Sequence, residues 1–232
     1  MYFDPLYIAA MVLGGALCAW ASWRVKSNFN KYSKVGVRSG MTGAQAAMAV
    51  ARAGGATDVS IERHQGFLSD HYDPRVKTLR LSPEVYDGQS ISSIAVAAHE
   101  AGHAIQHAQA YAPLGLRSAL VPVVTIGNRM WVLPFIGGLI LMGGSPFLGE
   151  TLMKVGVGLF SMVVLFQLVT LPVEFDASRR AKAVLAETGI VQTDEEARGV
   201  SKVLGAAALT YVAAALSSMM TLAVLLLRVS RR

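Results

Sequence analysis

Long apolar runs dominate the pattern of hydrophobic and polar positions along the chain. They cover residues 6–23, about 130–144, 152–171 and 203–227. A helix needs roughly 20 apolar residues to cross the hydrocarbon core of a bilayer, so the pattern predicts about four transmembrane helices. Asn128 and Arg129 would be costly at mid-bilayer and place the start of the second run near residue 130. An earlier start near residue 120, with the arginine facing protein, stays open.

The polar stretch that follows the first apolar run shows shorter periods. Residues 42–52 are predicted to form a capped helix that stops at a pair of glycines. Three short strands are predicted at residues 59–64, 67–72 and 76–81, with alternation clearest in the last. We therefore expect a short antiparallel sheet that packs on the next helix. The fold class is an α-helical integral membrane protein with a small α+β domain.

That next helix, residues 91–111, carries the sequence His99-Glu100-Ala101-Gly102-His103. Ser90 or Ser92 can cap its start, and it is expected to end before Pro113. Histidines four apart lie on one helical face, where both imidazoles can bind a metal ion at about 2.0–2.1 Å. Glu100 lies beside that position and can move a proton from the attacking water to the leaving amine. The motif is H-E-x-x-H.

A third ligand is sought downstream because three ligands on one straight helix lie too far apart for one ion. His107 is on the same face one turn further on. We therefore expect its side chain to contact the metal ligands without binding the metal, or to face solvent. Glu174 follows the third apolar run, before a predicted helix at residues 175–187. It would complete a His, His, Glu set with the fourth position open to water.

The segments HEAGHAIQH and LPVEFDASRRA, at residues 99–107 and 171–181, carry a family resemblance. The chain resembles membrane zinc metallopeptidases of the YugP type, in the neutral zinc metallopeptidase family. It is more distantly similar to HtpX-type gluzincins. The resemblance implies a zincin-like catalytic domain holding one Zn2+, with His99, His103 and Glu174 as ligands and Glu100 as catalytic base.

One position departs from the HtpX-type pattern. Those proteins carry Asp four residues after the ligand Glu, whereas this chain has Ser178. We expect Ser178, or Asp176, to orient His99 instead.

Further residues are candidates for contacts with the substrate. The charge that develops on a scissile carbonyl could be stabilised by one of several side chains, among which the sequence does not choose. These are His64, His71, Tyr72, Tyr111, Arg179 and Arg180. The strand at residues 76–81 could be an edge that binds an extended peptide through its main chain at Val76, Thr78 and Leu79. A purely structural hairpin is an equal alternative.

Composition agrees with a membrane protein. Of the 232 residues, 53% are hydrophobic and only 16% are charged, against roughly 25% in soluble proteins. The net charge of +6 comes from basic residues that flank apolar runs, without the aromatic-interleaved basic stripe of a nucleic-acid binder. A lipid bilayer is therefore the predicted partner, and nucleic acid is not. The single Cys18 excludes an internal disulfide.

Basic residues from Arg24 to Arg38 follow the first run and predict a cytoplasmic location for the chain after it. Asp4 and the lack of a basic start favour an uncleaved anchor. The third run would return Glu174 to the cytoplasmic side. The basic tail at residues 228–232 would also prefer the cytoplasm, but four spans place it outside. The last segment could instead be re-entrant or lie along the membrane.

Five regions are expected. They are an anchor (1–23), a cytoplasmic catalytic part (24–112), a transmembrane hairpin with a turn at 146–150 (113–173), helices with the third ligand (174–202) and a last span with a basic tail (203–232).

The expected function is a membrane-embedded zinc metalloendopeptidase at the cytoplasmic face of a bacterial plasma membrane. Its substrates would be peptides or membrane proteins, in membrane-protein quality control by analogy with HtpX-type proteases. A site-2-type intramembrane protease is one alternative, in which an Asp of a later span is the third ligand. A catalytically inactive zinc-binding scaffold is another, which a missing base would indicate, but Glu100 is present.

Overall fold

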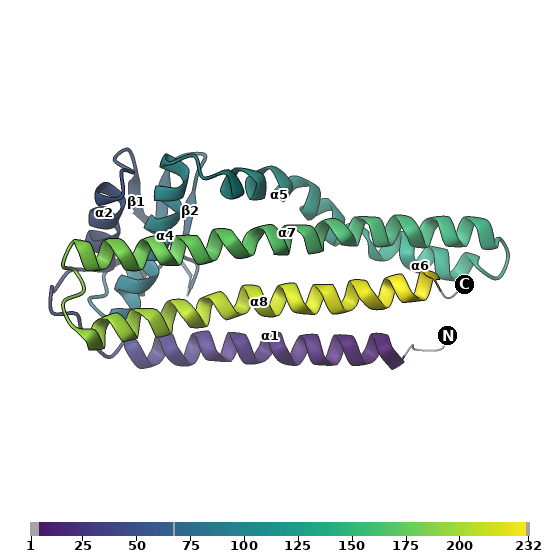
Figure 1. Ribbon diagram of the computed structural model, residues 1–232, viewed down its shortest axis with the longest axis horizontal. Coiled ribbons are helices and arrows are strands. Elements are labelled where there is room, and N and C mark those ends of the chain that lie inside the picture. The colour runs from purple at the N-terminus through teal and green to yellow at the C-terminus, as the bar shows by residue number, and fades with distance from the viewer. Residues whose placement is uncertain (1–4, 67, 231–232) are drawn as a thin grey trace. The chain divides into compact units, whose positions relative to one another are not determined.

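The computed structural model describes residues 5–66 and 68–230, and over these residues the chain forms eight helices and three short strands (Figure 1). Asp4, Phe67 and the last two residues of the basic tail, which entered the expectations above, lie outside the described residues. The elements in chain order are α1 (Pro5–Tyr32), α2 (Gly43–Ala53), β1 (Ser60–Arg63), β2 (His71–Asp73), β3 (Thr78–Leu81), α3 (Pro83–Tyr86), α4 (Ile91–Ala108), α5 (Ala112–Met130), α6 (Val132–Leu141), α7 (Pro146–Glu187) and α8 (Asp194–Ser230).

Four helical stretches of the described chain are long and apolar enough to cross a membrane, as predicted. They are α1, the α5–α6 stretch Ala112–Leu141, α7 and α8. The second stretch becomes helical at Ala112, well before the expected start near residue 130. Asn128 and Arg129 therefore lie in the last turn of α5, just before α6.

Helix α7 corrects the predicted boundaries around the third span. A turn at residues 146–150 and a separate helix at residues 175–187 were expected, but Pro146–Glu187 is one helix of 42 residues. Pro172 lies inside this helix. An interior proline removes one hydrogen bond and costs about 3 kcal/mol, which the many other bonds of a long helix can absorb. Glu174 therefore lies on the same helix as the third apolar run.

The chain divides into two compact units. The first consists of the described residues among 1–20, 116–171 and 211–232. Its interior is apolar, with Phe135, Met153 and Phe160 among its buried side chains. Gly156 lets two helices approach closely, since a Cβ there would lie 2.8 Å from the backbone oxygen of Trp131. Close packing at small residues is typical of membrane helices.

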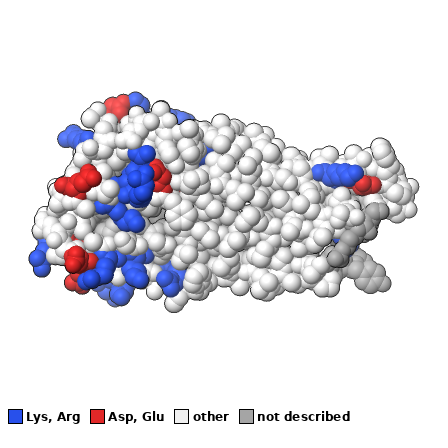
Figure 2. All heavy atoms as spheres, viewed as in Figure 1, with Lys and Arg blue, Asp and Glu red and all other residues white. Residues whose placement is uncertain are grey.

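The second unit consists of residues 21–115 and 172–210 and carries the H-E-x-x-H helix. Helix α4 lies in its core, where its alanines pack against α2 and the sheet. Charged side chains gather over the elements of this unit on the face drawn in Figure 2, whereas the helices of the first unit present a largely uncharged surface. The distribution agrees with a polar unit and a lipid-facing unit in one chain.

The sheet is mixed, so the predicted antiparallel arrangement is wrong. Its strand order is β1-β3-β2. Strand β1 runs parallel to β3, with Ser60 opposite Thr78, and β2 runs antiparallel to it, with His71 opposite Arg80. Strands β1 and β2 follow each other in the chain but lie on opposite sides of β3.

Strand β3 is therefore central and is no sheet edge. Thr78 and Leu79 pair on both sides, and Val76 precedes the strand. The edge strands of the described sheet are β1 and β2. This corrects the prediction that Val76, Thr78 and Leu79 form a substrate-binding edge.

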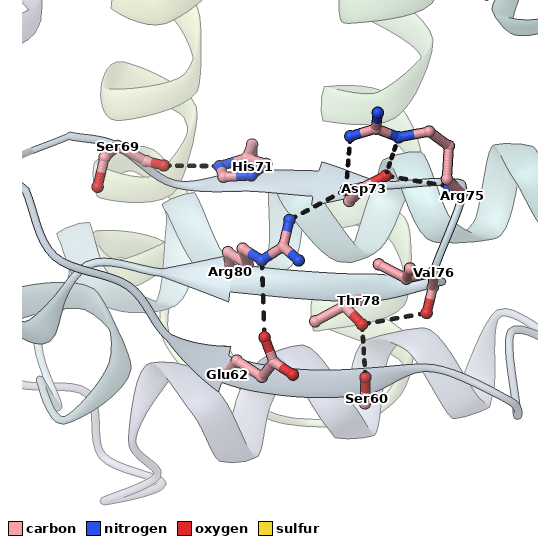
Figure 3. A network of polar contacts seen from close by, with 9 residues as sticks. All are labelled: Ser60, Glu62, Ser69, His71, Asp73, Arg75, Val76, Thr78 and Arg80. Carbon is pink, nitrogen blue, oxygen red and sulfur yellow. Dashed lines mark hydrogen bonds and ion pairs between the residues drawn. The ribbon is translucent and has the colours of Figure 1, made fainter.

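A polar network joins the three strands on one face of the sheet (Figure 3). Arg80 on β3 donates to Asp73 on β2 at 3.0 Å and lies 3.6 Å from Glu62 on β1. Arg75 donates to both carboxylate oxygens of Asp73 at 3.0 Å. These hydrogen bonds from Arg75, and the one from Arg80, hold the pKa of Asp73 well below its usual range. The other face carries Leu79, which is fully buried in the core.

Candidate metal centre

Helix α4 forms as the sequence predicts, and the structure selects Ser90 as its cap. The side chain of Ser90 accepts a hydrogen bond from the backbone N–H of Ser93 at 3.1 Å. The helix ends at Ala108, and Ala110 follows in the left-handed conformation with φ 51°. Two backbone bonds, from Ala110 to His107 and from Tyr111 to Gln106, close this end.

Two histidines of α4 and one glutamate of α7 converge on a single point. The Oε2 atom of Glu174 lies 3.2 Å from Nε2 of His99 and 3.6 Å from Nε2 of His103. One ligand atom from each residue lies within 4.8 Å of the others. Two ligands on one tetrahedral zinc ion are about 3.3 Å apart when each bond is about 2.0–2.1 Å. The cluster is therefore able to hold one metal ion.

Burial supports the same interpretation. Only 2% of the Glu174 side chain is exposed, and the side chains of His99 and His103 are 12% and 11% exposed. A carboxylate so far removed from water requires a compensating positive charge or several hydrogen bonds. Two neutral imidazoles and a buried carboxylate are the donor set that Zn2+ prefers.

Gly102, inside the motif, allows α7 to approach α4 closely. A Cβ at this position would lie 2.4 Å from the backbone oxygen of Ala177. Ala177 lies between the third cluster residue, Glu174, and Ser178 on α7. The glycine thereby sets the distance between the two helices that share the cluster.

Each histidine has a partner on its Nδ1 side. Ser178 lies with its hydroxyl oxygen 3.1 Å from Nδ1 of His99. Of the two residues predicted to orient His99, the structure therefore brings Ser178 to it. Asp176 contacts Gln106, Arg179 and Arg180 instead.

The partner of His103 is Gln106, which the sequence interpretation missed. Its Oε1 lies 3.0 Å from Nδ1 of His103. Its Nε2 donates to the backbone oxygen of Val173 at 2.8 Å and to Oδ2 of Asp176 at 2.9 Å. A signal was present, because Gln106 is a polar residue three positions after His103 on a helix otherwise rich in alanine.

The two arginines that follow Asp176 make their contacts with residues outside the His99–His103–Glu174 cluster. Arg179 pairs with Asp176, and 70% of its side chain is exposed. Arg180 also pairs with Asp176, donates to the side chain of Gln109 and lies over the ring of Tyr111, 5.5 Å from its centre. These contacts tie the end of α4 to α7.

His107 is not one of the three cluster residues and contacts strand β2 instead. Its Nδ1 lies 2.8 Å from the hydroxyl of Tyr72 on strand β2. Burial, together with the charges of Asp58 and Asp73, raises the pKa of Tyr72 to about 12. The pair connects the edge strand β2 with the helix that carries the motif.

The charge of Glu100 acts on Asp70, the residue before β2. Glu100 is buried, with 8% of its surface exposed. Burial raises the pKa of Asp70. Hydrogen bonds from Ser82 lower it, and the negative charge of Glu100 raises it. His71 is the next residue. Its Nδ1 donates a hydrogen bond to the backbone oxygen of Ser69, because a carbonyl oxygen can only accept. Its ring lies 5.4 Å from that of His64.

Comparisons with known proteins agree with this geometry. The family model described as "Putative neutral zinc metallopeptidase" matches residues 7–230. The chain is 49% identical over 222 residues to the "Putative membrane protease YugP" of Bacillus subtilis (strain 168), covering 96% of this chain and 94% of that protein. No solved structure matches the chain. The H-E-x-x-H helix, the His–His–Glu cluster and these matches lead to one conclusion: the chain belongs to the neutral zinc metallopeptidase family.

Proposed function

We propose that the chain is a membrane-embedded endopeptidase of the gluzincin class, with His99, His103 and Glu174 as zinc ligands and Glu100 as catalytic base. The observation that carries the proposal is the approach of Glu174 to both motif histidines, at 3.2 and 3.6 Å. A third ligand of this kind, Glu from a second helix, favours the gluzincin class over a site-2-type protease, whose third ligand would be an Asp in a later span.

A zinc ion held by His99, His103 and Glu174 would supply Lewis acidity, which activates water and polarises a carbonyl near neutral pH. Three protein ligands are the number typical of catalytic zinc sites. The residues around the ligands keep the imidazoles in place, through Ser178 at His99 and Gln106 at His103. Such outer contacts commonly change metal affinity by 10–100-fold.

In this proposal Glu100 is the proton carrier. It follows His99 directly on α4 and is buried. In this role it accepts the proton of the attacking water and then donates it to the nitrogen of the leaving amine. Its presence also argues against a catalytically inactive scaffold.

Strand β2 is the edge that fits an extended peptide. It is an edge of the described sheet, and Tyr72 on β2 reaches His107 on the motif helix. A substrate strand that paired with its backbone would gain main-chain hydrogen bonds without requiring a particular side-chain sequence. In this proposal β2 takes the substrate role that was first assigned to Val76, Thr78 and Leu79.

The proposed substrates are cytoplasmic loops or tails of membrane proteins, in the quality control of a bacterial plasma membrane. Support comes from the basic residues that follow the first span, from Arg24 to Arg38. Further support comes from the four apolar helices and from the similarity to a protein named as a membrane protease.

The test combines metal content with proteolysis. Purified protein in detergent is incubated with an unfolded membrane protein, with and without a zinc chelator, and zinc is then added back. We expect cleavage to stop with the chelator and to return with zinc. His99→Ala, His103→Ala and Glu174→Ala should each lose most of their zinc, whereas His107→Ala should retain it. Full zinc occupancy in Glu174→Ala would contradict the proposed ligand set.

A further inference from the structure

Gln106 connects the metal cluster to the backbone of α7. It is fully buried in α4, three residues after His103. Its side chain makes three polar contacts, with Nδ1 of His103, the backbone oxygen of Val173 and Oδ2 of Asp176. A buried amide with all three contacts made has a defined orientation.

The chemistry of these partners fixes which end of the amide faces the histidine. The carbonyl of Val173 and the carboxylate of Asp176 can only accept hydrogen bonds, so the NH2 group must face them. The amide oxygen is then left for His103. Turning the amide over would place its oxygen against two other acceptors, so the reverse orientation is disfavoured.

An amide oxygen can only accept, so Nδ1 of His103 must donate a hydrogen. In a neutral imidazole the other nitrogen, Nε2, then carries the lone pair. That nitrogen is the one that lies 3.6 Å from Glu174 in the cluster. The three contacts of Gln106 thus select the form of His103 that can bind a metal.

We propose that Gln106 is a positioning residue that holds His103 in its metal-binding tautomer and ring orientation, with Asp176 and Val173 as its anchors. The inference rests on the proposed function, since it requires a metal at His103. Asp176 is itself held by Arg179 and Arg180, so the anchor has a fixed place on α7.

His99 differs in this respect. Its partner is the hydroxyl of Ser178, which can either donate or accept. A hydroxyl does not select one tautomer, so Ser178 fixes the position of the His99 ring but not its tautomer. Removing Gln106 should therefore weaken metal binding more than removing the hydroxyl of Ser178.

The experiment measures zinc affinity by chelator competition and the visible spectrum of the Co2+-substituted protein. Gln106→Met keeps the approximate volume and lacks the amide. We expect it to bind zinc about 10–100-fold more weakly, with an altered Co2+ spectrum. Ser178→Ala should show a smaller loss. Gln109→Met is the matched control, because Gln109 directly follows α4 as its C-cap, and its side chain bonds to Gly54 and Arg180.

A second variant keeps the test valid if Gln106→Met does not fold. Asp176→Ala removes one anchor and leaves Gln106 in place, so zinc affinity should fall by a smaller factor. If Gln106→Met folds, the same change in its background should have no further effect, because Asp176 acts through Gln106. Thermal unfolding of the metal-free proteins separates loss of folding from loss of affinity.

Two results distinguish this inference from the proposed function. If His103→Ala loses zinc but Gln106→Met binds it as tightly as the unmodified protein, the role of Gln106 is wrong and the metal site stands. If His103→Ala also binds zinc normally, the site itself is wrong and the inference falls with it. Additive effects of Gln106→Met and Asp176→Ala would contradict the anchoring role of Asp176.

Discussion

The backbone oxygen of Ala177 lies directly opposite Gly102, at a distance that leaves no room for a side chain between α4 and α7. A Cβ on residue 102 would lie 2.4 Å from that oxygen. The two helices carry the histidines and the glutamate of one cluster. Their close approach therefore makes the metal site dependent on a residue that is not a ligand.

Gly102→Ala should separate α4 from α7 and weaken both stability and metal binding. We expect a loss of about 1–3 kcal/mol in the free energy of unfolding, as for other overpacked cores. Zinc affinity should fall because Glu174 moves away from the histidines. Gly205→Ala is the matched control, since a Cβ there meets nothing within 4 Å and alanine favours the helix. Equal zinc affinity in Gly102→Ala and the unmodified protein would show that this contact does not set the site.

The end of the metal helix offers a stabilising change. Ala110 adopts φ 51°, a left-handed conformation that glycine adopts without strain. Ala110→Gly should raise the free energy of unfolding by about 0.5–1 kcal/mol. Ala108→Gly, inside the last turn of α4, should lower it by a similar amount. Thermal unfolding measures both, and a destabilised Ala110→Gly would contradict the proposed relief of strain.

Asp73 makes the stability of the fold depend on pH. Its folded pKa is lowered by hydrogen bonds from Arg75 and Arg80, so its charged form stabilises the fold above the unfolded pKa of about 4. That contribution is lost as the pH falls below about 4 toward the folded pKa. Asp73→Asn should therefore be less stable than the unmodified protein at pH 7, with a difference that narrows in acid. A difference that is constant between pH 7 and pH 3 would contradict this assignment.

The side of the membrane on which the second unit lies can be mapped by labelling. Lys77→Cys and Asp87→Cys, each in a Cys18→Ser background, replace side chains that are 50% and 53% exposed. In intact cells, impermeant thiol reagents should label them only after the membrane is opened. Gly144→Cys, in the turn between α6 and α7, should be labelled without opening. Labelling of Lys77→Cys in intact cells would place the second unit outside.

Local features of the fold followed from the sequence. A capped start was predicted for α2, and for α4 a cap at Ser90 or Ser92, because caps involve neighbouring residues; the structure has a capping box of Thr42 with Gln45 and a cap at Ser90. The four spans followed from the length of the apolar runs. The prediction of an apolar run at residues 152–171 and a separate helix at residues 175–187 was wrong, because the change from apolar to charged residues does not interrupt α7.

Features that depend on distant residues were harder to predict. The order β1-β3-β2 places two strands that are consecutive in the chain on opposite sides of β3, and no short sequence motif predicts this order. The spacing of His99 and His103 predicted a metal face, and the convergence of Glu174 required a guess about a second helix. Gln106 was overlooked because its three partners come from positions up to 70 residues apart in the chain.

The most direct test of the central claim is the activity of Glu100→Gln measured together with its zinc content. Glutamine keeps the shape of the side chain but cannot accept the proton of the attacking water. We predict zinc content equal to that of the unmodified protein and a loss of proteolysis of at least about 100-fold, the lower end of what a general base contributes. Unchanged turnover in zinc-loaded Glu100→Gln would contradict the assignment of Glu100 as the base and, with it, the proposed mechanism.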